Sequence, residues 1–120
     1  MGKLLVHITH GPEAPTRAAL GFLVARAAIE EGHDVSLFLA GDAVQLVREP
    51  VLDGLTGLGT GSLRESWDAV VAGGAHIYVS GMSSKARGVS EQDLAAKPAE
   101  FAQPGRLVQL AFEADRVLTY

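Results

Sequence analysis

Most of the polar groups able to bind or transform a ligand lie in one short segment, residues 80–88, which follows an apolar run. It carries three hydroxyls and two cations, on Ser80, Ser83, Ser84, Lys85 and Arg87. Hydroxyls, cations and free backbone N–H groups at a turn are suitable donors for phosphate, sulfate or carboxylate. The segment has neither P-loop nor GxGxxG spacing. An anion site and a capped turn with solvated cations therefore both remain open.

His10 is the second candidate, because it stands where an apolar stretch ends at Gly11 and Pro12. A histidine there suits proton transfer or pH-sensitive ligand binding. The other three histidines, His7, His33 and His76, share no ligand-like spacing, and no acidic cluster accompanies them. We expect structural roles for those three and no metal site or other cofactor.

Serine catalysis is disfavoured by the same residues. A hydrolase elbow shows G-x-S-x-G, with an acid and a histidine later in the chain. Here the segment around Ser83 reads Gly-Met-Ser-Ser-Lys, and no histidine follows His76. Serine catalysis would be possible only if His10 lay close to Ser80 in the fold. Capping and loop hydrogen bonds are the better interpretation of the serines.

The elements that must position these groups alternate between strand and helix. Residues 3–9 and 34–40 are rich in β-branched and aliphatic residues, and residues 14–31 have a helical apolar stripe. Together they predict a right-handed βαβ unit. Helical turns are expected at 43–48, and the glycine-rich stretch at 53–61 is either a mobile loop or holds a short strand at 55–58. The remaining expected elements are a helix from Ser62 to 72 with Glu65 in a capping box, a strand at 76–79, a polar loop at 80–88, a capped turn at 90–94, a helix at 106–114 and a strand at 116–119.

This alternation predicts an α/β fold: a mostly parallel sheet of four or five strands with helices on both faces, in one domain over residues 1–120. Ligands of such sheets bind beyond the carboxyl ends of the strands, where strand order reverses. We expect the first strand between the second and the strand at 76–79. The loops at 10–16 and 80–88 would then face one another.

Composition narrows the function classes. The 120 residues are 48% hydrophobic and 20% charged, which excludes a disordered chain. A formal charge of −4 gives no general attraction to nucleic acid or anionic lipid. There is no cysteine, which removes disulfides, thiolate metal sites and thiol catalysis. No apolar run approaches the ~20 residues of a membrane helix, and the opening residues do not resemble a signal peptide. A cytoplasmic location is the expectation.

The first helix also carries many small side chains, at Ala18, Ala19, Gly21, Ala25 and Ala27. Small residues permit close packing, and a second subunit is one candidate for the surface that packs there. Trp67 and Tyr78 are expected in the core or at a subunit interface.

The sequence resembles the DsrE/DsrF-like family, which includes sulfur-relay proteins. The likeness rests on three stretches: the opening strand into Gly-Pro-Glu-Ala-Pro at 11–15, Glu-Gly-His-Asp-Val at 31–35 running into Phe-Leu-Ala-Gly-Asp at 38–42, and the segment from Ile77 to Ala-Arg-Gly at 86–88. The resemblance implies a three-layer α/β/α fold and a trimeric or hexameric assembly.

Sulfur-transferring members of that family carry persulfide on a cysteine, and in many relatives a cysteine falls where this chain has Ser80 or Ser83. A hydroxyl cannot hold a transferable sulfane sulfur as a thiolate does. Persulfide relay by this chain's own side chains is therefore excluded on chemical grounds.

The leading hypothesis is a non-catalytic homo-oligomer that binds a small polar or anionic ligand, or a protein partner, at the carboxyl edge of the sheet. Its expected binding residues are His10, Ser80, Ser83, Ser84, Lys85 and Arg87. Two alternatives stay open: a structural subunit of a sulfur-relay hetero-oligomer, and a small enzyme that uses His10 as acid or base.

Overall fold

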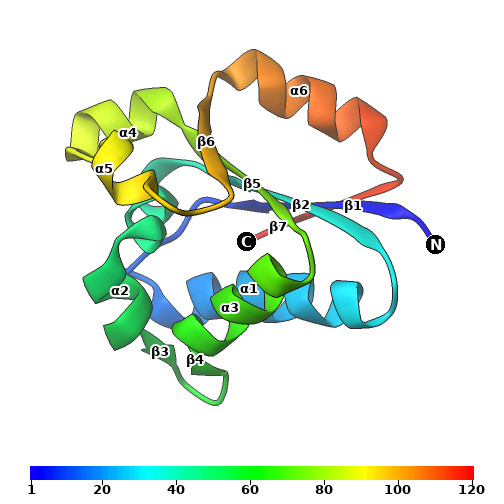
Figure 1. Cartoon of the computed structure of the whole chain (residues 1–120), viewed down its shortest axis with the longest axis horizontal. Helices are drawn as coiled ribbons and strands as arrows, with labels where there is room; N and C mark the ends of the chain where they lie inside the picture. Colours follow the sequence, from blue (N-terminus) through cyan, green and yellow to red (C-terminus); the bar gives the residue numbers. More distant parts are fainter.

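The computed structural model describes residues 1–120 and contains a five-stranded parallel sheet in the order β6-β5-β2-β1-β7 (Figure 1). Every neighbouring pair in this sheet runs parallel. The α/β fold with a mostly parallel sheet, expected from the alternating pattern, is confirmed. The strands are β1 (Lys3–Ile8), β2 (Asp34–Leu39), β5 (His76–Ser80), β6 (Ala99–Ala102) and β7 (Arg116–Thr119).

Helices cover both faces of the sheet. In Figure 1, α1 (Pro15–Glu30) and α3 (Leu63–Ala72) lie below it and α6 (Pro104–Glu113) lies above it. The shorter elements gather toward the carboxyl ends of the strands. They are the 3-10 helix η1 (Gly41–Val47), α2 (Glu49–Gly54), the hairpin of β3 (Thr56–Gly57) and β4 (Gly61–Ser62), α4 (Gly81–Arg87) and α5 (Glu91–Leu94).

The small residues of α1 are used inside the chain. A side chain on Gly21 would overlap the side chain of Ile8 on β1, so glycine lets the helix lie close to the sheet. Ala18 and Ala25 are fully buried in the same layer. This intrachain packing accounts for four of the five small residues, Ala18, Ala19, Gly21 and Ala25, without a second subunit. Ala27 is exposed.

The two faces of the sheet are unequal. The face under α1 and α3 holds a cluster of 23 buried residues, including Trp67. The face under α6 holds only five, including Tyr78. Trp67 and Tyr78 are therefore both core residues of this chain. A single helix, α6, covers the second face, and Phe112 on that helix is 88% exposed.

The position of β1 differs from the expectation. β2, not β1, pairs with β5, and β1 lies between β2 and β7. The last strand, β7, pairs with the other side of β1, with residues 116–119 beside residues 4–7. As a result, the loop after β1 and the segment after β5 are separated by the segment that follows β2.

Two local assignments also differ from the sequence interpretation. Residues 81–87 form the helix α4 rather than a loop, with Ser80 as its N-cap and Gly88 in a left-handed conformation at its end. Strand β6 was not expected, because Ala99–Ala102 has little β-propensity. The short strand expected at 55–58 is present as β3, which pairs with β4 in a hairpin. No helix has the length and hydropathy needed to span a membrane.

Candidate functional site

At the carboxyl edge of the sheet, α4 is anchored by the very groups that looked available for a ligand. The Ser80 hydroxyl accepts a hydrogen bond from the amide of Ser83 at 3.2 Å. The Ser83 hydroxyl in turn accepts from the amide of Gly41 at 2.8 Å. These two serines act as a helix cap and a loop tether, as the capping interpretation predicted.

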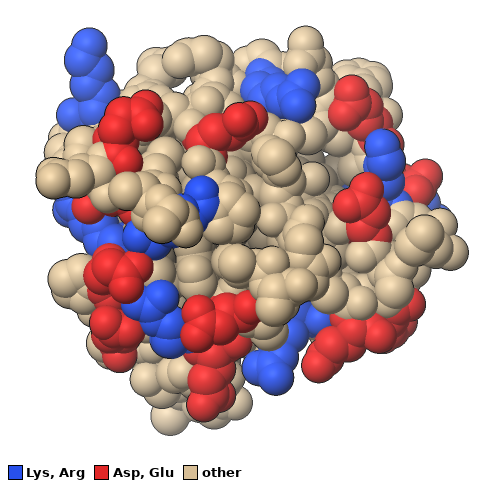
Figure 2. Space-filling model, viewed as in Figure 1, with Lys and Arg blue, Asp and Glu red and all other residues tan.

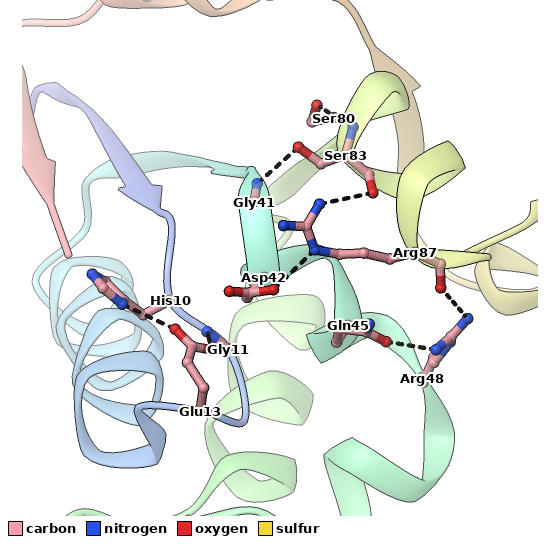
Figure 3. A network of polar contacts seen from close by, with 10 residues as sticks. All are labelled: His10, Gly11, Glu13, Gly41, Asp42, Gln45, Arg48, Ser80, Ser83 and Arg87. Carbon is pink, nitrogen blue, oxygen red and sulfur yellow. Dashed lines mark hydrogen bonds and ion pairs between the residues drawn. The ribbon is translucent and has the colours of Figure 1, made fainter.

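Arg87 is likewise engaged by the protein. Its Nε donates to a carboxylate oxygen of Asp42 at 2.9 Å, and its guanidinium also contacts the carbonyl of Ser83 (Figure 3). The sequence marked the cation but not its partner, because Asp42 lies 45 residues away and reaches it only through the β2–β5 pairing. Arg87 therefore fixes α4 to η1 and is not a free anion-binding group.

Gly11 brings the loop after β1 against the same segment. A β-carbon on Gly11 would overlap the backbone carbonyl of Asp42, so only glycine permits this approach. The segments after β1, β2 and β5 therefore form one packed edge, with Gly41 and Asp42 in the middle (Figure 3). His10 and Ser80 lie on opposite sides of that middle segment and share no contact.

His10 belongs to a separate cluster with Glu13 and Arg17. Its Nδ1 lies 3.0 Å from a Glu13 carboxylate oxygen, and its Nε2 lies 3.3 Å from an Arg17 guanidinium nitrogen. The other Glu13 oxygen accepts from the amide of Gly11 at 2.8 Å. Because Arg17 can only donate, Nε2 is the acceptor and Nδ1 carries the proton toward Glu13.

An open groove of about 850 Å³, the largest in the protein, lies beside this cluster. It runs between the start of α1 and the ends of β1 and β7 and is lined by Thr9, His10, Ala14, Pro15, Thr16, Arg17, Leu20, Thr119 and Tyr120. Thr9 joins two of the lining segments, since its amide donates to the carbonyl of Tyr120 at 2.9 Å.

The start of α1 adds backbone donors to the groove. Its N-cap, Ala14, has no side chain able to cap the helix. Pro15 has no N–H, and the amides of Thr16 and Arg17 donate to no acceptor in the chain. Uncapped amides at a helix start attract negative charge. The groove thus combines a guanidinium, an imidazole and two free amides.

The remaining two predicted binding residues face away from this groove. Ser84 is buried on the opposite side of α4, and Lys85 is exposed next to it. Six residues expected to form one site are therefore distributed over three places. Sequence reasoning missed Arg17, although its spacing of seven residues from His10, across a helix start, was the available signal.

The other histidines have structural surroundings. His7 packs edge-on against Phe38, with ring centroids 5.9 Å apart, and burial lowers its pKa. His33 accepts from the amide of Gly2 at 3.0 Å. His76 is exposed and lies 3.9 Å from Glu100. No group of three His, Asp or Glu side chains is placed to hold a metal ion.

The family model of the DsrE/DsrF-like family matches residues 2–120. The chain belongs to this family. Its fold is similar to the crystal structure of the ychN protein from E. coli, with 22% identity, a TM-score of 0.81 and full coverage of both chains. It is also similar to BT1422 from Bacteroides thetaiotaomicron, a conserved protein of unknown function. That match has 12% identity and a TM-score of 0.71, and covers 99% of this chain and 95% of the other.

No curated protein matches the chain. The two structural likenesses show the DsrE-like fold, and the identities are too low for a function to follow from them. Within the family, this chain is a member with no cysteine.

Proposed function

We propose that this DsrE/DsrF-like protein is a non-catalytic binding protein for a small phosphate-type anion, held in the groove beside α1. The observation that carries the proposal is the meeting of Arg17 and His10 over the largest hollow, next to two unpaired amides. The site remains at the carboxyl edge of the sheet, but its cation is Arg17 rather than Arg87.

Electrostatics favour an anion there over a cation. Glu13 is the one carboxylate in the cluster. It does not line the groove, and the Gly11 amide and the His10 ring occupy its two oxygens. Arg17 has no carboxylate partner within ion-pair distance. A guanidinium without a counter-ion is the usual partner of phosphate and carboxylate groups.

The geometry favours binding over acid–base catalysis. A general base needs a free lone pair toward its substrate. The Nε2 lone pair of His10 faces Arg17 instead, and no serine or threonine hydroxyl makes a hydrogen bond to the ring. Proton transfer by His10 would require Arg17 to leave first.

Binding to the groove is tested by calorimetric titration with pyrophosphate, together with an NMR titration that locates the perturbed amides. Arg17→Met should weaken binding at least about tenfold, the value of one or more charge-assisted hydrogen bonds. Arg26→Met is the matched control, because Arg26 lies on the same helix and pairs with Glu30. If pyrophosphate does not bind, or binds equally to both variants, the proposal is wrong.

We further propose that the protein is a homo-oligomer, a trimer or hexamer, assembled through the thinly covered side of the sheet. Three large apolar side chains are exposed on that side: Val108 and Phe112 on α6, and Val117 on β7, which lies beside Leu5. Leu118 is also exposed, on the opposite face of β7. β7 pairs with β1 alone, so its other edge is free. An open edge strand beside exposed apolar side chains is a typical association surface.

Native mass spectrometry of the purified protein tests this assembly and reveals any retained small molecule. A trimer or hexamer that dissociates in a Phe112→Ser variant supports the proposal. A monomer that assembles only with a cysteine-bearing relative would support instead a structural subunit of a sulfur-relay hetero-oligomer. A monomer under both conditions contradicts both forms of assembly.

A further inference from the structure

A second hollow lies on the side of α4 that faces away from the groove. Its volume is about 450 Å³, and it is lined by Gly81, Met82, Ser84, Lys85, Val89, Phe101 and Gln103. Ser80, Ser83 and Arg87, which anchor α4, are not part of it. The hollow is therefore lined by the two polar residues of this segment, Ser84 and Lys85, that do not anchor α4.

Ser84 supplies an unpaired hydroxyl. Its side chain is 1% exposed, and its Oγ makes no hydrogen bond in the chain. A buried hydroxyl without a partner costs free energy comparable to a lost hydrogen bond, and such groups are rare. Only one other buried side-chain atom is in this state, His7 Nε2, which lies on β1, away from α4.

Lys85 supplies an unpaired cation. The chain has three lysines, and Lys97 pairs with Glu49 at 2.9 Å. Lys85 has no carboxylate within ion-pair distance, and neither has Lys3, at the far end of the sheet. Lys85 is therefore an uncompensated positive charge at the edge of a hollow.

Gln103 supplies an amide. Its Nε2 lies against Gly81, where a β-carbon would come within 3.3 Å of it, and the residue is exposed. The walls between these polar groups are apolar: Met82, Val89 and Phe101. A mostly apolar hollow with a few convergent polar groups is the usual form of a small-molecule site.

We propose that this hollow binds a small carboxylate with a compact apolar body, such as an aromatic acid. The ammonium of Lys85 pairs with the carboxylate, the hydroxyl of Ser84 and the amide of Gln103 donate to its oxygens, and the apolar body lies against Met82 and Phe101. A polyanion such as pyrophosphate would leave the apolar walls unused, so the ligand class differs from that of the groove.

The test is an NMR titration of the full chain with benzoate at neutral pH, with benzyl alcohol as the uncharged probe of the same shape. Benzoate should shift the amides around Gly81, Lys85 and Gln103 in a saturable way. Lys85→Met should weaken benzoate binding at least about tenfold, and leave benzyl alcohol unaffected. Lys3→Met is the matched control, since both lysines lack an ion pair.

Ser84→Ala should weaken benzoate binding severalfold, because the ligand loses one donor. Absence of saturable shifts, equal binding by the Lys85 and Lys3 variants, or shifts centred on His10 and Arg17 would each overturn the proposal. Arg17→Met should leave benzoate binding unchanged. The two sites can therefore fail independently.

Discussion

The replacement Gly11→Ala tests how the carboxyl edge of the sheet is held together. The added methyl group would lie 2.7 Å from the carbonyl carbon of Asp42 and closer still to its oxygen. Carbon atoms in contact normally lie about 3.5–4.0 Å apart. The loop after β1 or the segment after β2 must therefore move by roughly 1 Å, the difference between these contact distances.

The obstacle is backbone, which cannot rotate away as a side chain would. Overpacking of this kind costs about 1–3 kcal/mol, and the reduced freedom of the unfolded chain returns about 0.5 kcal/mol. We expect a net loss of about 1.5 kcal/mol in the free energy of unfolding. For a chain of this size, that lowers Tm by roughly 5–9 °C.

The assay is urea denaturation followed by circular dichroism at one fixed protein concentration. Gly105→Ala is the control, because a β-carbon there meets nothing within 4 Å in α6. It should be neutral or stabilising by up to about 1 kcal/mol. A Gly11→Ala protein within about 0.5 kcal/mol of wild type, well below the overpacking range, would refute the close approach. Amide shifts of His10 and Asp42 should change in that variant, since both segments move.

Three further outcomes follow from single contacts. Arg87→Met should destabilise the chain by about 1 kcal/mol, since its pair with Asp42 is partly exposed, and urea denaturation measures this loss. Burial lowers the pKa of His7, so the unfolded chain takes up that proton first. The stabilisation from neutral His7 is complete above pH 6.5 and is lost as the pH falls through the pKa of His7 in the folded chain. In a His7→Gln variant, the free energy of unfolding should therefore depend less on pH in this range. The hydrogen bond from Lys97 is the largest cause of the lowered pKa of Glu49. The stabilisation from this carboxylate is present above pH 4.5, its ordinary pKa, and is lost as the pH falls through its pKa in the folded chain. In Lys97→Met, the free energy of unfolding should therefore fall less steeply with pH in that window.

Local patterns predicted most elements of the fold. The apolar strand at 3–8, the helix begun by Pro15 and ended before Gly32, and the Ser62 cap of α3 depend on near neighbours in the chain. The short strand β6 could not be predicted, because the residues of Ala99–Ala102 have little β-propensity of their own. The segment is a strand because it pairs with β5.

The roles of the site residues were likewise predictable only where they depend on near neighbours in the chain. The serine caps could be read from the sequence, because Ser80 and the amide it binds are three residues apart. The partner of Arg87 could not, because 45 residues separate it from Asp42. Nor could the free state of Lys85 be inferred, since it depends on no carboxylate reaching that side of α4.

By itself, the sequence determined the fold class, the absence of thiol chemistry and the chemical types available at the carboxyl edge. Periodicity, turn residues and the missing cysteine are properties of the chain that need no knowledge of distant contacts. Only the tertiary structure decided which of those groups make hydrogen bonds or ion pairs within the chain and which remain free to bind a ligand. That outcome depends on strand order: β2 lies between β1 and β5, so its following segment separates His10 from Ser80 and neutralises Arg87 through Asp42.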